Sequence, residues 1–205
     1  MNGVKNLIVI IDYEMGNLPN VKRALNKFTE DVIISSNKDD IKKADKLILP
    51  GVGAFGDAMR NIDRLDLRDT IIEEATKKPL LGICLGLHLL FEKSEEDMTQ
   101  DGLGLIKGTV KKFPIKKGFK VPEMGWNDIK KVKESKILKG IDSGNYFYFV
   151  HSYYISEEES VAAAKTDYIL DYTSVIEKDN IMATQFHPEK SHDMGLKMLE
   201  NFVNL

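Results

Sequence analysis

Cys84 is the single cysteine of this chain, and it lies between two glycines in the segment Gly82-Ile83-Cys84-Leu85-Gly86. Apolar residues enter and leave this segment, which predicts a buried strand, a sharp turn carrying the thiol, and a helix. Glycines suit such a turn because a Cβ would clash in its crowded backbone. The first turn of a helix favours the thiolate, which is the nucleophilic form. The alternative is that Cys84 is an inert residue of the core.

A nucleophilic thiol needs a base, and His187 is the strongest candidate among the four histidines. It follows a predicted strand and precedes Pro188, which disfavours helix at His187 and keeps it extended. Glu189 comes two residues later, where its carboxylate can hydrogen-bond the ring and fix its tautomer. Alone, this segment is more typical of a structural histidine at a strand end beside a surface glutamate. Combined with the cysteine turn, it predicts a catalytic triad of Cys84, His187 and Glu189.

A glycine-rich segment, Pro50-Gly51-Val52-Gly53-Ala54-Phe55-Gly56, follows another predicted strand. Its glycines leave backbone N–H groups free to converge on an anion. The N–H of Val52 or Gly53, with the N–H of Leu85 after the cysteine, is therefore a candidate oxyanion hole for acyl transfer. The segment lacks the lysine and hydroxyl residue of a phosphate-binding P-loop, and a plain strand-to-helix turn is the simpler alternative.

The composition is that of an ordinary globular chain of 205 residues, 42% hydrophobic and 30% charged. A net charge of −3 gives no reason to expect nucleic acid or an anionic membrane as a partner. No apolar run reaches the ~18 residues of a membrane span, and the N-terminus lacks the pattern of a signal peptide. One cysteine excludes an internal disulfide. We therefore expect a cytoplasmic protein with one domain over residues 1–205.

The elements that must position these residues alternate in the first half of the chain. The predicted buried strands span residues 7–11, 32–34, 46–49 and 80–83. The predicted helices span residues 17–28 and 57–77, the second in one or two pieces. This alternation predicts an α/β fold with a mixed, mostly parallel sheet flanked by helices.

The pattern changes to turn-rich strands after about residue 102. We expect these strands to extend the same sheet in antiparallel fashion. They span residues 109–113, 126–130, 146–151, 160–166, 172–176 and 181–184. A closing helix is expected over residues 193–203.

The cysteine turn and the segment Gln185-Phe186-His187-Pro188-Glu189 together resemble the class I (triad) glutamine amidotransferases. Further segments are similar to the glutaminase subunits of imidazole glycerol phosphate synthases, and the resemblance covers nearly the whole chain. These segments are Asp12-Tyr13-Glu14-Met15-Gly16-Asn17, Pro50 to Gly56, Met124-Gly125-Trp126-Asn127, Tyr148-Phe149-Val150-His151-Ser152-Tyr153 and Pro188-Glu189-Lys190-Ser191.

The resemblance implies a single-domain class I glutamine amidotransferase fold with a nucleophile elbow at Cys84. It implies that Cys84 attacks the side-chain amide of L-glutamine, that His187 acts as the base, and that Glu189 orients His187. The amino-acid end of glutamine is expected near Gly53, His88 and the segment His151-Ser152-Tyr153. Neither a metal nor an organic cofactor is expected.

The family also implies a partner. Because the motifs extend from Asp12 to Ser191, the ammonia acceptor is expected on a second protein, in this family a (β/α)₈ cyclase that forms a heterodimer. The pair makes imidazole glycerol phosphate and an aminoimidazole carboxamide ribotide in histidine biosynthesis. Trp126 and Asn127 are the candidate docking residues, although a buried core tryptophan is an equally good interpretation.

Three residues depart from the family pattern. His88 stands where glutamine is usual, at a position associated with holding the substrate. Glu14 and Glu123 stand where glycine and histidine are usual, in segments expected to face the partner. Three alternatives remain open: a paralogous glutaminase serving a cell-surface sugar amidotransferase, a non-catalytic regulatory subunit, and a cysteine hydrolase of the broader elbow type.

Overall fold

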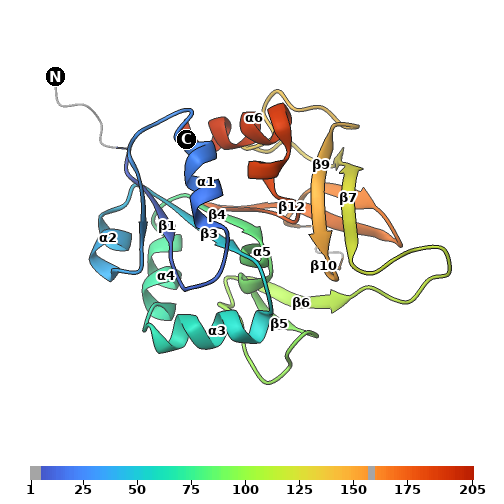
Figure 1. Ribbon diagram of the computed structural model, residues 1–205, viewed down its shortest axis with the longest axis horizontal. Coiled ribbons are helices and arrows are strands. Elements are labelled where there is room, and N and C mark those ends of the chain that lie inside the picture. Colours follow the sequence, from blue (N-terminus) through green and yellow to red (C-terminus); the bar gives the residue numbers. More distant parts are fainter. Residues whose placement is uncertain (1–5, 157–159) are drawn as a thin grey trace.

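A large mixed sheet crosses the molecule, with helices packed on both of its faces (Figure 1). The computed structural model describes residues 6–156 and 160–205. Five neighbouring strands of this sheet run parallel, in the order β2-β1-β3-β4-β13. They are β1 (Ile8–Ile11), β2 (Val32–Ser35), β3 (Lys46–Gly51), β4 (Leu80–Cys84) and β13 (Ile181–Thr184). The predicted α/β fold with a mostly parallel core is confirmed.

The sheet continues beyond β13 in mixed directions. β12 is antiparallel to β13, β10 is antiparallel to both β12 and β6, and β5 pairs with β6 in parallel. β11 pairs with β12, and β8 pairs with β11. These strands are β5 (Phe91–Ser94), β6 (Ile106–Lys112), β8 (Lys130–Lys131), β10 (Tyr153–Ile155), β11 (Ala162–Asp167) and β12 (Asp171–Lys178).

Two predicted strands form a separate sheet instead of extending the large one. Within the described residues, β7 (Glu123–Asp128) and β9 (Tyr146–His151) pair antiparallel only with each other, with Trp126 opposite Tyr148. The expectation of one continuous sheet was therefore wrong for these strands. Their alternating pattern identifies a strand but not its partner. The packing of Phe147 against Phe186, with ring centroids 4.1 Å apart, holds the small sheet against the core.

Both faces of the parallel strands are covered. On β1, Ile8 and Ile10 belong to one hydrophobic cluster, while Val9 and Ile11 belong to a second cluster on the other face. Residues of α1 and α6 join the first cluster, and residues of α2, α3, α4 and α5 join the second. The helices are α1 (Leu18–Leu25), α2 (Lys38–Lys43), α3 (Phe55–Arg64), α4 (Arg68–Ala75), α5 (Leu85–Leu89) and α6 (His192–Val203), with a 3₁₀ turn, η1, at Pro188–Lys190. None of the helices in the described parts of the chain could cross a membrane.

The differences from the predicted elements are small and local. The helix expected over residues 57–77 is two helices, α3 and α4, and the break holds Asp66 in the left-handed region at φ 55°. The sequence did not predict α2, β5 or β10. α2 buries only Ile41, and β10 is three residues long, so neither carries a hydrophobic period.

Glu14 adopts a backbone conformation that explains why the family usually has glycine there. Its φ is 66°, in the left-handed region that side chains with a Cβ disfavour. Its carboxylate forms an ion pair with Arg64 of α3. The pair is exposed and therefore contributes little to stability, but it ties the loop after β1 to the helix.

We expect Gly86→Ala to lower the free energy of unfolding by at least about 3 kcal/mol, because overpacking against a rigid backbone cannot relax cheaply. A Cβ at residue 86 would lie 1.7 Å from the carbonyl oxygen of Leu49 on β3. Gly118→Ala is the matched control, since its Cβ would meet open space and only the left-handed backbone, φ 92°, opposes it. It should cost about 1–2 kcal/mol. Equal losses in urea unfolding would contradict this close approach of α5 to β3.

Candidate active site

Cys84 lies at a strained elbow between β4 and α5. Its φ of 53° and ψ of −105° place a non-glycine residue in the left-handed region. The flanking positions leave no room for a side chain. A Cβ on Gly82 would lie 3.0 Å from the Cβ of Ala183, and a Cβ on Gly86 would clash with the backbone of β3. Strain of this kind clusters at functional sites, because the surrounding structure must impose it. The elbow predicted from the glycine spacing is present.

His187 comes to the same edge of the sheet because it follows β13, the parallel neighbour of β4. Its Nδ1 donates to Oε1 of Glu189 at 2.8 Å, and both side chains are almost fully buried. The backbone is also held, because Ser191 Oγ donates to the His187 carbonyl at 2.6 Å. The short turn η1 that begins at Pro188 brings the Glu189 carboxylate to Nδ1 of the ring.

The environment of His187 favours the imidazolium. Burial acts to lower the pKa of His187, but interactions with Cys84 and then with Glu189 outweigh it and raise the pKa to about 9. Its Nε2 is buried and makes no hydrogen bond within the described residues. Nδ1 is engaged by Glu189, so Nε2 is the nitrogen available for proton transfer with a thiol or a ligand.

A cavity of about 300 Å³ opens at the elbow. Every residue predicted to catalyse or to contact glutamine lines it, with the exception of Glu189, which lies behind His187. These residues are Val52, Gly53, Cys84, Leu85, His88, His151, Ser152, Tyr153 and His187. The structure therefore brings together residues that are up to 135 positions apart, from Val52 to His187.

Tyr13 supports the candidate oxyanion loop, which spans residues 50–53. The hydroxyl of Tyr13 donates to the carbonyl of Pro50, and its ring is fully buried. Burial, with the nearby Cys84 as a smaller cause, raises the pKa of Tyr13, so the phenol stays a donor. Gly51 must lack a side chain, because its Cβ would lie 2.1 Å from that hydroxyl. Gly53 has φ 103°, and Val52 beside it is 41% exposed at the cavity rim.

His88 is engaged by another side chain. Its Nε2 lies 2.8 Å from Oε1 of Gln185. Because that oxygen only accepts, Nε2 carries the proton. Burial lowers the pKa of His88 to about 4, outweighing the opposite effect of Gln185, so the ring is neutral. The Nε2 of Gln185 lies 4.0 Å from the sulfur of Cys84, which places this amide between His88 and the thiol.

The sequence assigned no role at the cavity to three residues, Gln185, Glu96 and Glu123. Gln185 lies inside the histidine motif but received no role, and Glu96 lines the cavity and accepts a hydrogen bond from the Phe55 N–H at 3.0 Å. Glu123 lies in a segment expected to face the partner, but its own side chain is 3% exposed and contacts His151 and Tyr172. The presence of Glu123 before Met124-Gly125-Trp126-Asn127, where the family usually has histidine, was the sequence feature that could have identified it.

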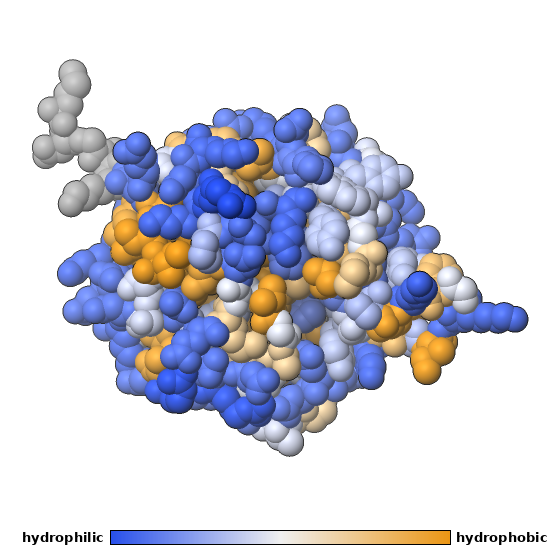
Figure 2. Space-filling model, in the orientation of Figure 1, coloured by the Kyte–Doolittle hydropathy of each residue, from blue (hydrophilic) through white to orange (hydrophobic). Residues whose placement is uncertain are grey.

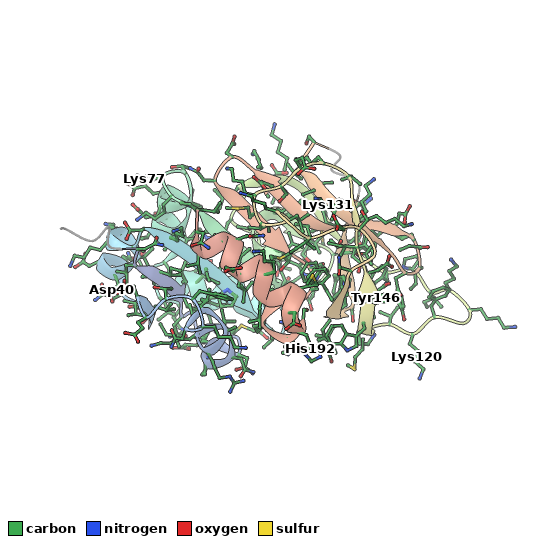
Figure 3. All side chains as sticks on the ribbon, turned by 90° about the horizontal axis from the view of Figure 1, so that it is seen from above. Asp40, Lys77, Lys120, Lys131, Tyr146 and His192 are labelled. Atoms are coloured by element: carbon green, nitrogen blue, oxygen red, sulfur yellow. The ribbon has the colours of Figure 1, made fainter. Side chains whose placement is uncertain are left out.

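Trp126 and Asn127 lie outside the cavity. Trp126 is 45% exposed and stacks on His192 with ring centroids 4.9 Å apart, so it is not a core tryptophan. Asn127 turns inward and donates to Glu123 and to the carbonyl of Asp167. In Figure 3, His192 and Tyr146, which flank this region in the fold, lie on the same side of the molecule as Lys120. No group of three or more His, Cys, Asp or Glu side chains in residues 6–156 and 160–205 is arranged to hold a metal ion.

We expect the pKa of His187 to fall toward 6.5 in Cys84→Ala, because one of the two interactions that raise it to about 9 is lost. Glu189→Gln should lower it as well, whereas Glu134→Gln, at an exposed site, should not. Histidine-selective NMR titration measures this directly. The raised pKa stabilises the folded state fully below pH 6.5 and loses that contribution as the pH rises through about 9. An unchanged titration of His187 in Cys84→Ala would contradict the proximity of the two groups.

Comparison with known proteins agrees with this geometry. The family described as glutamine amidotransferase class-I matches residues 9–205. The "imidazole glycerol phosphate synthase subunit HisH" of Methanocaldococcus jannaschii is 49% identical over 97% of this chain and 100% of its own length. The subunit of the same name from Aquifex aeolicus is 52% identical, over 95% and 94% of the two chains.

Solved structures share the fold at much lower identity. A crystal structure of a glutamine amidotransferase superimposes with a TM-score of 0.74 at 19% identity, covering 96% of this chain and 99% of that one. PurLQS from Thermotoga maritima gives a TM-score of 0.74 at 18% identity, covering 98% and 99%. The match over residues 9–205 and the similarity over nearly full length place the chain in one family: it belongs to the class-I glutamine amidotransferases.

Proposed function

We propose that this chain is the glutaminase subunit of an imidazole glycerol phosphate synthase. It hydrolyses L-glutamine to glutamate and ammonia and passes the ammonia to a cyclase subunit in histidine biosynthesis. The observation that carries the proposal is the single cavity that joins the Cys84 elbow, the His187–Glu189 pair and the glycine-rich loop. The names of the relatives from Methanocaldococcus jannaschii and Aquifex aeolicus, both subunits of that synthase, favour it over a sugar-amidating paralogue.

The chemistry follows from the placement of the groups. The Cys84 thiolate attacks the amide carbon of glutamine, and the developing oxyanion is held by N–H groups of Val52 or Gly53 and of Leu85. His187, as the imidazolium, gives its Nε2 proton to the departing nitrogen, and ammonia leaves. A water that loses a proton to His187 then attacks the thioester and releases glutamate and the thiolate. Neither step requires a metal or an organic cofactor.

Glutamine is held by the remaining cavity residues. We place its amino-acid end against Gly53, the neutral His88 and the turn His151-Ser152-Tyr153, all of which line the cavity. A volume of about 300 Å³ suits one small amino acid better than a peptide or a nucleotide. Residues 1–205 then act as one glutaminase domain, in the cytoplasm, where a lone thiolate stays reduced.

The partner is proposed to be a (β/α)₈ cyclase that docks on the surface around β7. Met124 and Trp126 on β7 are 66% and 45% exposed, and Phe119 and Val121 on the preceding loop are also exposed. Figure 2 shows hydrophobic residues among charged ones on the projection formed by this loop, at the right of the view. An exposed apolar patch with a polar rim is typical of a protein interface. We call these four residues the docking surface.

Cys84→Ala should abolish glutamine-dependent synthesis by the complex with the cyclase, because no other nucleophile is available at the elbow. Synthesis from added ammonium salt should remain, since it bypasses the glutaminase. The assay follows imidazole glycerol phosphate with either nitrogen source. The proposal fails if glutamine still supports turnover in this variant, or if the wild-type complex with the cyclase uses ammonia but not glutamine.

Trp126→Ala should weaken binding to the cyclase by about 30-fold, which corresponds to the ~2 kcal/mol typical of an aromatic hot spot. Titration of labelled cyclase measures the dissociation constant. Val132→Ala, which removes another half-exposed apolar side chain outside the docking surface, is the matched control and should leave the constant unchanged. Equal effects of the two substitutions would place the interface elsewhere.

A further inference from the structure

A buried cluster of polar side chains adjoins the cavity, and the proposed mechanism gives a role to only one of its three members, His151. Glu123 of β7, His151 of β9 and Tyr172 of β12 meet there. The side chains of His151 and Glu123 are 2% and 3% exposed, and Tyr172 is fully buried. Burying ionisable groups is unfavourable unless hydrogen bonds compensate. The donors and acceptors around each group therefore bear on where its protons lie.

The Glu123 carboxylate is surrounded by donors. Tyr172 donates its hydroxyl proton to Oε2 at 2.9 Å, and Asn127 Nδ2 donates to Oε1 at 2.9 Å. Burial, and then the charge of Glu123, raise the pKa of Tyr172 well above its ordinary value, so the phenol keeps this proton. Both oxygens of the Glu123 carboxylate therefore accept hydrogen bonds from neighbouring side chains.

His151 faces acceptors at both ring nitrogens. Its Nδ1 lies 2.8 Å from the carbonyl oxygen of Tyr153, which only accepts, so Nδ1 carries a proton. Its Nε2 lies 3.2 Å from Oε2 of Glu123 and 3.2 Å from the hydroxyl oxygen of Tyr172, whose single proton points at Glu123. An unprotonated nitrogen would be repelled by these two oxygens. A proton on Nε2 would instead give both oxygens a donor.

We propose that Glu123 is a positioning residue that keeps His151 doubly protonated and thereby fixes the turn of residues 151–153 that lines the cavity. His151 Nδ1 donates a hydrogen bond to the Tyr153 carbonyl across this turn, and the Phe113 N–H donates to the Ser152 carbonyl at 3.1 Å. Because the Tyr153 and Ser152 carbonyls both accept hydrogen bonds from within the protein, the backbone of this turn is held in one orientation relative to the cavity. Treating that ligand as glutamine rests on the proposed function.

The neighbouring charges around His151 are consistent with this state. Cys84, His88 and Glu96 line the same cavity as His151, and His151 is a smaller cause than burial of the lowered pKa of His88. The aromatic rings of Phe113 and Phe149 pack at 5.3 Å and 5.8 Å from the His151 ring and exclude solvent from it. Within the described residues, Glu123 is the one carboxylate in contact with His151.

Histidine-selective ¹⁵N NMR of the resting protein tests the charge state without reference to glutamine. The chain has four histidines, and His151→Asn assigns the resonances of His151 by their loss. Wild type should show both His151 nitrogens protonated at neutral pH. Glu123→Gln should convert Nε2 to the unprotonated form, and Tyr172→Phe, which keeps the carboxylate, should leave both protons in place. Glu134→Gln, at an exposed site, should change nothing.

Steady-state kinetics of the complex with the cyclase tests the positioning role. Glu123→Gln should raise KM for glutamine about tenfold, the loss expected for one charged hydrogen bond, while kcat changes less than about threefold. Alkylation of Cys84 by iodoacetamide should keep its wild-type rate, because the elbow and His187 are untouched. A general loss of structure would instead lower kcat strongly and change the alkylation rate of Cys84 as well.

A neutral His151 in the wild-type spectrum overturns the inference, and so does an unchanged His151 spectrum in Glu123→Gln. If Glu123→Gln does not fold, the wild-type and Tyr172→Phe spectra still decide the charge state. A failure of the proposed function gives a different pattern, in which Cys84→Ala retains glutamine turnover while His151 still carries two protons.

Discussion

The backbone of Cys84 is the constraint on which the rest of the structure depends. A non-glycine residue at φ 53° and ψ −105° is strained by about 1–3 kcal/mol, and only a rigid surround can hold it. The neighbouring parallel strands β3 and β13 supply this rigidity, because β4, which ends at Cys84, lies between them. The same arrangement brings the ends of those two strands beside the thiol, which delivers the Pro50–Gly53 loop from one side and His187 from the other.

The local parts of the site were predictable from the sequence. The glycines around Cys84 indicate the elbow because a side chain at either position would clash with neighbouring atoms. The order His187-Pro188-Glu189 places the base and its carboxylate two residues apart. The position of β7 and β9 was not predictable, since alternation of side chains does not determine which edge a strand pairs with. The same reasoning applies to Trp126, whose exposure depends on that separate sheet.

The protonation states of the histidines could not be predicted either. Each depends on a side chain far away in the chain or on burial that only the fold creates. His88 meets Gln185, 97 residues later, and His151 meets Glu123 across the β7–β9 pair. His187 has one local partner, Glu189, and one distant partner, Cys84. Sequence motifs therefore identified which histidines reach the cavity but not which of them are charged there.

The two unusual residues, His88 and Glu123, are connected by this electrostatic arrangement. Three imidazoles around one cavity of about 300 Å³ would repel one another if all were charged. His151 and His187 each have a buried carboxylate beside them, whereas His88 has only the neutral amide of Gln185. Burial, with His151 as a smaller cause, keeps His88 neutral, with its proton on Nε2. A neutral imidazole presents one donor and one acceptor, as an amide does, so His88 can occupy a position where the family usually has glutamine.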